Sequence, residues 1–165
     1  MHGLSPVRLR FIRETAERHF GIAPGKVKPL EGLKLLDIGC GGGLVCEPMA
    51  RLGAAVTGVD ASEANIKTAL THAQEEGLSI DYRAGTAEGL IDAGEPPFDI
   101  VLNLEVVEHV ADPVQFLKVT PSLVTPGGPM VVCTLNKPPK APAPALVAED
   151  LTLGVPPRRT HHRQE

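Results

Sequence analysis

The sequence predicts an α/β fold built on a doubly wound parallel sheet of about five strands, and two observations lead to this. Apolar stretches of strand length alternate five times with segments that carry helical signals. The first stretch, residues 33–38, runs directly into a glycine-rich loop at residues 39–43. In such folds the crossovers are right-handed, helices cover both faces, and ligands lie beyond the carboxyl ends of the strands.

Length and composition fit one domain with a tail. The chain has 165 residues and a formal net charge of -4. We expect a domain over residues 1–136, comprising an N-terminal helix and loop (1–31) and the α/β core (32–136). Residues 137–165 are rich in Pro and basic residues, and we expect them to be poorly ordered. Three cysteines without metal-site spacing are expected to be reduced core thiols.

Several function classes are disfavoured by composition. Aromatic residues make up 3% of the chain, with no Trp, so the chain lacks a platform for stacking nucleic-acid bases. The acidic net charge also argues against a nucleic-acid partner. No apolar run reaches the roughly 18 residues of a transmembrane helix, and no signal peptide is expected.

The first expected element is an amphipathic helix near residues 5–20. Ser5-Pro6 is a helix-start signal, and apolar residues then recur at helical spacing. Arg8 falls in the first turn, where a cation opposes the helix dipole. Arg8 is therefore either a ligand contact or a solvated surface side chain. A loop rich in Gly and Pro follows, up to residue 31.

The core then alternates strands and helices. Apolar or alternating runs predict strands at 33–38, 54–59, 79–84, 98–104 and 129–135. Helical spacing closed by a nearby Gly predicts helices at 44–52, 62–76 and 87–93. A last helix is expected from Asp112-Pro113, an N-cap followed by Pro, and Pro121 is expected to kink or shorten it.

The glycine loop admits two ligand classes. A dinucleotide fingerprint requires a third Gly where this chain has Leu44, although Gly39 and Gly41 fit the first two positions. Asp37 precedes the loop by two residues, which is awkward beside a pyrophosphate. A carboxylate there suits a cationic ligand that bears an ammonium and a sulfonium. The loop therefore resembles the first motif of class I S-adenosylmethionine (SAM)-dependent methyltransferases, and an NAD-dependent oxidoreductase is the less favoured alternative.

Polar residues at the ends of the next strands extend this site. Asp60, followed by Ala61, stands roughly 20 positions beyond the first Gly, where a carboxylate accepts hydrogen bonds from both ribose hydroxyls. The alternative role for Asp60 is to cap the next helix, which Ser62 could also do. Thr86 and Ala87 follow the third strand and are candidates for contact with an adenine ring.

A cluster of ionisable residues follows the fourth strand, which ends near Leu104. Glu105, Glu108 and His109 fall at i, i+3 and i+4, on one face of a helical turn. They could bind a divalent cation, for which oxygen ligands favour Mg²⁺, or serve acid–base chemistry. The remaining alternative is an ordinary helix start with acids near the positive end of the dipole.

Taken together, the motifs resemble the ubiquinone-biosynthesis O-methyltransferase family, whose members use SAM to methylate polyprenylated catechols and demethylubiquinol. The resemblance covers roughly residues 3–137. It rests on these segments: Ser5-Pro6-Val7-Arg8-Leu9, Phe11-Ile12-Arg13, Leu36-Asp37-Ile38-Gly39-Cys40-Gly41-Gly42-Gly43, Arg51-Leu52-Gly53-Ala54, Val56-Thr57-Gly58-Val59-Asp60, Glu105-Val106-Val107-Glu108-His109-Val110, Pro126-Gly127-Gly128 and Thr134-Leu135-Asn136-Lys137.

The resemblance implies a Rossmann-like class I SAM methyltransferase sheet with defined site residues. It implies SAM contacts at Arg8, Gly39, Asp60 and Leu104, and Mg²⁺ at Glu105, Glu108 and His109. The implied reaction is in-line methyl transfer to a phenolate oxygen, with His109 as the base if no metal binds.

The chain departs from the family beyond Lys137. Family members keep an amphipathic segment and further strands there, whereas this sequence is Pro-rich and ends at Glu165. We therefore expect a C-terminally truncated sheet, and a non-catalytic SAM-binding or scaffold subunit of a quinone-biosynthesis complex is the alternative function. An uncovered sheet edge favours oligomers. The basic tail either meets an anionic membrane surface or is solvated. The family implies the cytoplasmic face of the bacterial inner membrane, or the mitochondrial matrix or inner membrane.

Overall fold

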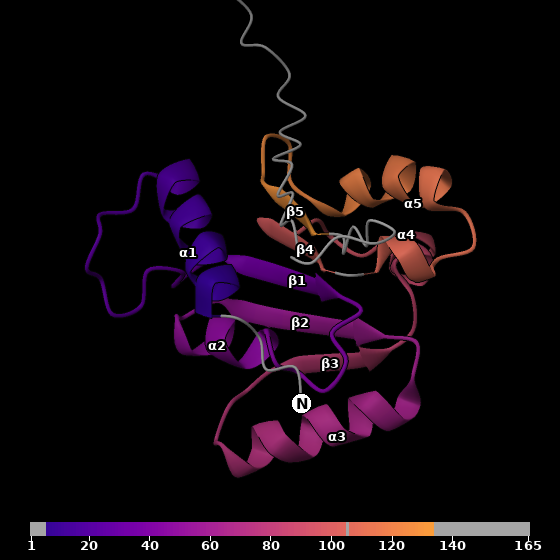
Figure 1. The fold of residues 1–165 in the computed structure, drawn as a ribbon, viewed down its shortest axis with the longest axis horizontal. Coiled ribbons are helices and arrows are strands. Elements are labelled where there is room, and N and C mark those ends of the chain that lie inside the picture. Colours follow the sequence, from indigo (N-terminus) through magenta and orange to yellow (C-terminus); the bar gives the residue numbers. More distant parts are fainter. Residues whose placement is uncertain (1–5, 105, 134–165) are drawn as a thin grey trace, which may run out of the picture.

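The structure is a computed structural model that describes residues 6–104 and 106–133. It contains one parallel sheet with helices on both faces (Figure 1). The strands are β1 (Lys34–Ile38), β2 (Ala55–Asp60), β3 (Asp81–Ala84), β4 (Ile100–Leu104) and β5 (Met130–Cys133). The α-helices are α1 (Pro6–Phe20), α2 (Cys46–Arg51), α3 (Glu63–Glu75), α4 (Ala87–Asp92) and α5 (Pro113–Val119). Two 3-10 helices, η1 (Val107–His109) and η2 (Thr120–Leu123), flank α5.

The five strands run parallel in the order β3-β2-β1-β4-β5. The chain thus starts at the centre of the sheet and adds strands first on one side and then on the other. This confirms the predicted doubly wound α/β fold. Since all strands point the same way, the loops after β1, β2, β3 and β4 gather at one edge of the sheet.

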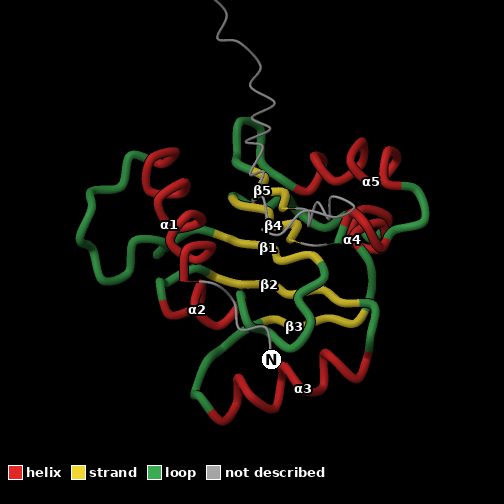
Figure 2. Tube along the Cα trace, viewed as in Figure 1, coloured by secondary structure: helices red, strands yellow, loops and turns green. Residues whose placement is uncertain are grey.

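The two faces of the sheet bury separate apolar clusters. On the first face, side chains such as Leu35 and Leu102 pack with α1, α2 and α3. On the second face, Leu36, Ile38 and Val101 pack with α4 and α5. Figure 2 shows the strands between these helices. A strand covered on both faces carries apolar residues at nearly every position, which is why β1 and β4 read as continuous apolar runs.

Element boundaries differ from the predicted ones where backbone geometry intervenes. The helix predicted to open at Leu44 begins at Cys46, because Gly41 and Gly43 adopt positive φ and keep the chain in turns. Pro48 is tolerated in the first turn of α2, where no intrahelical N–H bond is required. The helix α5 ends before Pro121 and continues as η2, as predicted.

The strands β3 and β4 each begin two residues later than predicted, and the predicted end of the fifth strand is not among the described residues. Phe98 lies outside β4 and forms an isolated bridge to Val124, whereas β3 begins at Asp81. The predicted end of the fifth strand at residues 134–135 lies outside the described residues, as does the tail at 137–165. Within the described residues, no helix is both long and apolar enough to cross a membrane.

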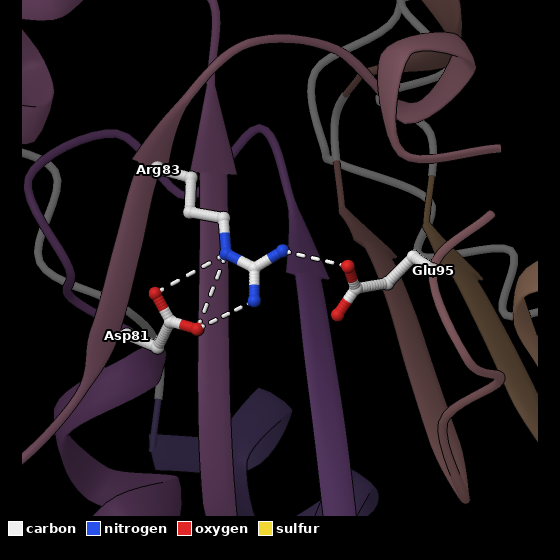
Figure 3. A network of polar contacts seen from close by, with 3 residues as sticks. All are labelled: Asp81, Arg83 and Glu95. Carbon is white, nitrogen blue, oxygen red and sulfur yellow. Dashed lines mark hydrogen bonds and ion pairs between the residues drawn. The ribbon is translucent and has the colours of Figure 1, made fainter. Parts of the chain in front are cut away.

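An ion network stabilises the β3 edge of the sheet (Figure 3). Arg83 Nη2 donates to Asp81 Oδ2 at 2.7 Å, and Arg83 Nη1 donates to Glu95 Oε2 at 2.9 Å. Glu95 follows α4, so the guanidinium connects the edge strand to the helix layer on the second face. Charged side chains on an edge strand also oppose pairing with a strand of another molecule.

Candidate cofactor site

The glycine loop folds over the carboxyl end of β2. The N–H groups of Gly39 and Cys40 both donate to the carbonyl oxygen of Val59, at 2.7 and 3.0 Å. Gly39 has a φ of +70°, and a Cβ atom there would overlap the Val106 side chain. Glycine is therefore required at this position for both backbone and steric reasons.

Asp60 joins this loop to the start of α3. Its Oδ2 accepts a hydrogen bond of 2.9 Å from the Gly41 N–H, and its Oδ1 accepts one of 2.9 Å from the Ser62 N–H. Asn65 Nδ2 also donates to Oδ1, at 3.3 Å. The N-cap of α3 is Ser62, whose hydroxyl accepts from the Asn65 N–H at 3.2 Å. The helix thus has its own cap, and Asp60 instead fixes the loop.

A cavity of about 300 Å³ opens beside Asp60 at the carboxyl edge of the sheet. Ile38, Val59 and Phe116 give it apolar walls. Six of the residues singled out from the sequence line this cavity: Gly39, Asp60, Ala61, Thr86, Ala87 and His109. They lie at or beyond the carboxyl ends of four different strands, and the parallel arrangement of the strands brings them together.

Thr86 has a structural task in addition to lining the cavity. It is the N-cap of α4, and its hydroxyl oxygen accepts a hydrogen bond of 3.1 Å from the Gly89 N–H. The next residue, Ala87, is buried. The strand β3 and the helix α4 are thus joined by a short, capped turn that forms one wall of the cavity.

Asp37 lies outside the cavity, on the opposite face of the sheet. Successive residues of a strand point to opposite faces, so the cavity-lining Ile38 places its neighbour Asp37 on the first face. The Asp37 side chain is 2% exposed, and the Cys46 thiol donates to its Oδ2 at 3.4 Å. Burial raises the pKa of Asp37 to about 7, against the opposing effect of the thiol hydrogen bond. The structure therefore shows no direct approach of this carboxyl to a ligand in the cavity.

Three further predicted contacts also lie outside the residues that line the cavity. Gly41 acts through its hydrogen bond to Asp60. Leu104 is buried in the first-face cluster, and Arg8 is half-buried in the first turn of α1. These residues stay predictions as cofactor contacts.

The predicted metal ligands are only partly within the described residues. Glu105 and the side chain of Glu108 lie outside them. His109 is exposed, lines the cavity and ends η1, where its N–H donates to the Val106 carbonyl at 2.9 Å. No group of three His, Cys, Asp or Glu side chains within the described residues is placed to hold a metal ion. The Mg²⁺ site remains a prediction.

The sequence analysis did not identify the apolar wall of the cavity. Besides Ile38 and Val59, this wall contains Val106 and Val110, which flank η1, and Phe116 of α5. Their signal is weak, because apolar residues at helical spacing usually indicate core packing. Phe116 does both, since it is also buried in the second-face cluster.

Comparison with known proteins places this site in a family. A sequence profile described as a methyltransferase domain matches residues 36–132, which include β2, β3 and β4 in full and most of β1 and β5. The chain belongs to the methyltransferase domain family. The matched range contains every residue that lines the cavity.

Two curated relatives of this methyltransferase domain carry the same name. This chain is 59% identical over 161 residues to the ubiquinone biosynthesis O-methyltransferase of Maricaulis maris. The alignment covers 98% of this chain and 63% of the relative. Identity to the protein of the same name from Parvibaculum lavamentivorans is 56%, with the same coverage. The chain thus spans about 63% of the length of these relatives.

Solved structures show the same fold. A SAM-dependent methyltransferase from Clostridium acetobutylicum superposes with a TM-score of 0.63 at 18% identity, covering 77% of this chain and 49% of that one. An arsenic(III) SAM methyltransferase from Chlamydomonas reinhardtii gives a TM-score of 0.59 at 26% identity, covering 80% and 50%. These similarities confirm the predicted methyltransferase type of sheet.

Proposed function

We propose that this chain binds SAM in the cavity beside Gly39 and Asp60, and that it forms part of an O-methyltransferase of ubiquinone biosynthesis. The acceptor would be a phenolic hydroxyl of a polyprenylated catechol or demethylubiquinol. The observation that carries the proposal is the identity of 59% to a named ubiquinone biosynthesis O-methyltransferase across 98% of the chain.

The residues around the cavity fit a nucleoside with a charged tail. Asp60 uses three of roughly four acceptor positions of its carboxylate, so it can accept a ribose hydroxyl at the remaining one. The second hydroxyl would compete with the long Asn65 contact. Val59 and Ala87 offer apolar surface to an adenine ring, and Gly39 lets the backbone approach closely. Bound SAM supplies a methyl group on a sulfonium, which is the electrophile.

His109 is our candidate for preparing the acceptor. A phenol with a pKa near 10 is mostly un-ionised at neutral pH, and the phenolate is the better nucleophile. An imidazole at the cavity can accept the phenolic proton. A divalent cation held by Glu105, Glu108 and His109 would favour the same phenolate, and this alternative stays open. A SAM titration with and without Mg²⁺, repeated in Glu108→Ala, separates the two.

A polyprenylated acceptor determines where the reaction occurs. A long isoprenoid chain partitions into lipid, so its head group reaches the protein at a membrane surface. The named relatives are bacterial, and we accordingly propose the cytoplasmic face of the inner membrane as the location. Contact with a quinone-biosynthesis assembly at the membrane would also bring the chain to this acceptor.

Calorimetric titration with SAM is the first test. We expect micromolar binding, and we expect no comparable binding of NADH. Turnover is then measured with a short-chain catechol. Binding of SAM without turnover would support the non-catalytic alternative. Absence of SAM binding in a demonstrably folded chain would contradict the proposal.

A further inference from the structure

Asn103 is a buried carboxamide whose polar atoms are both unpaired within the described residues. It lies on β4, is 0% exposed, and neither its Oδ1 nor its Nδ2 has a hydrogen-bond partner there. An unsatisfied buried amide lowers stability by roughly 1–3 kcal/mol, so folded proteins rarely retain one without a use. The environment of Asn103 therefore needs an explanation.

The register of the sheet places Asn103 beside the cavity. Asn103 is aligned with Ile38 on β1, and Ile38 is aligned with Val59 on β2. Ile38 and Val59 line the cavity, and both pack on the second face. Val101, two residues before Asn103, packs on that face too, so strand alternation places Asn103 there. Asn103 thus continues the row of second-face side chains formed by Val59 and Ile38, and it lies next to the two that line the cavity.

This position lies on the opposite side of β1 from Asp60. In the sheet order, β2 carries Asp60 and β4 carries Asn103, with β1 between them (Figure 1). If the ribose is held at Asp60, the other end of the cavity is left for the acceptor. His109 and Phe116, which follow β4 in the chain, line the same cavity.

We propose that Asn103 is a specificity-determining residue that recognises the catechol of the acceptor. This inference rests on the proposed function and deepens it. A carboxamide presents one donor and one acceptor side by side. A catechol monoanion is the complementary partner: Nδ2–H donates to the oxygen that takes the methyl group, and Oδ1 accepts from the neighbouring hydroxyl. The interaction favours the phenolate and discriminates against phenols that lack the second hydroxyl.

Access to Asn103 requires a small local movement. Because Asn103 is fully buried, a ligand in the cavity reaches it only when a neighbouring side chain moves aside. Val106 lines the cavity and packs against the second-face cluster. It is followed directly by η1, a single 3-10 turn with no side-chain cap. The proposal requires that a rotation of Val106 or a shift of this turn opens a path from the cavity to the carboxamide.

Thr120 provides a matched control. Its hydroxyl is also fully buried, without a hydrogen-bond partner among the described residues. It lies in η2, beyond α5, and does not line the cavity. Thr120→Val and Asn103→Leu are both near-isosteric and both remove an unpaired polar group, so each should raise the melting temperature.

The test compares these variants in ligand binding. A catechol with a short prenyl tail, and the corresponding monophenol, are titrated into the full chain with and without S-adenosylhomocysteine. We expect wild type and Thr120→Val to prefer the catechol at least tenfold. Asn103→Leu should lose that preference and bind both ligands alike, while its Kd for SAM stays within about twofold of wild type.

Two results would overturn the proposal. The first is that wild type binds the catechol and the monophenol alike, or that Asn103→Leu prefers the catechol as strongly as wild type does. The other is a lowered melting temperature in Asn103→Leu, which would mean that buried water already satisfies the amide and that its role is structural. The SAM titration of wild type is a separate measurement. Failure there would overturn the cofactor assignment and leave the catechol comparison still decisive for Asn103.

Discussion

Asp37 shows how burial turns a motif residue into a pH-dependent contribution to stability. Burial raises its pKa from 3.8 to about 7. The folded chain therefore keeps this proton at pH values where the unfolded chain has lost it, so stability falls as pH rises from about 4 to 7. At 1.4 kcal/mol per pKa unit, the loss amounts to about 4 kcal/mol.

Asp37→Asn should remove this pH dependence. The variant carries no ionisable carboxyl, so we expect it to be more stable than wild type at pH about 8, by up to about 4 kcal/mol, and similar at pH about 4. Urea unfolding of both proteins across this range measures the difference. An equal difference at both pH values would show that the effect of the substitution is unrelated to ionisation.

Asp60→Ala tests the ribose role of the β2 carboxylate. Losing a charged hydrogen-bond acceptor should weaken SAM binding by about 1.5–3 kcal/mol, measured by calorimetry. Ser62→Ala is the matched control, because Ser62 caps α3. That change should cost about 1 kcal/mol of stability and leave the SAM affinity unchanged. Equal effects of both changes on SAM binding would assign Asp60 to loop structure alone.

The residues of the site were predictable where they lie at the carboxyl ends of strands. Asp60 ends a strand, and Gly39, Thr86 and His109 come after strands, so the sequence could predict that these residues meet at one edge. The facing of Asp37 was harder to predict, because a strand buried on both faces hides its alternation in a continuous apolar run. The apolar run of β4 conceals the face of Asn103 in the same way.

At the scale of elements, α2 is held to α3 by two contacts that fix the segment after the glycine loop. Glu47 Oε1 contacts His72 Nδ1, and Arg51 Nη2 donates to Glu76 Oε2 at 3.0 Å. Glu47 is buried, whereas His72 is exposed. The contact with Glu47 raises the pKa of His72 above its usual 6.5. Protonated His72 thus pairs with a carboxylate that would otherwise be buried alone.

His72→Ala should therefore destabilise the chain in a pH-dependent way. A raised histidine pKa means that the stabilisation is fully present below pH 6.5 and is lost as pH rises through the folded-state value. We expect a lower melting temperature than wild type at pH about 5.5, and a smaller difference at pH about 9. Arg51→Ala, which breaks the exposed neighbouring pair, should show little change over the same range. A pH-independent effect of His72→Ala would point to lost packing instead.

Element boundaries were predictable only where local chemistry dominated. Ser62, Asp112 and Pro121 set helix ends through their own side chains or rings, and the structure has helix ends there. The start of α2 depends on the positive φ values of Gly41 and Gly43. The loop that holds them is fixed by non-local contacts, because Gly43 packs against Tyr82 and the Gly41 N–H donates to Asp60.

At the scale of the whole molecule, the residues of the cavity lie between Ile38 and Phe116, well inside the matched range 36–132. The chain spans about 63% of the length of its curated relatives, and the cavity is formed entirely within this part. If SAM binds in this cavity as proposed, cofactor binding should be separable from acceptor methylation, because methylation also needs a complete acceptor site.

Ligand-induced stabilisation tests this separation. A ligand that binds only the folded chain raises the free energy of unfolding by about 2.7 kcal/mol at 100 times its Kd, which corresponds to a shift of roughly 5–10 °C in the melting temperature. We expect SAM to produce such a shift and NADH to produce none, since Leu44 replaces the third Gly of a dinucleotide loop. At the same SAM concentration the shift should fall to about half or less in Asp60→Ala and persist in His109→Ala, because only Asp60 is assigned to the ribose. Equal shifts with SAM and NADH would mean that the cavity recognises the adenosine they share and not the sulfonium amino acid.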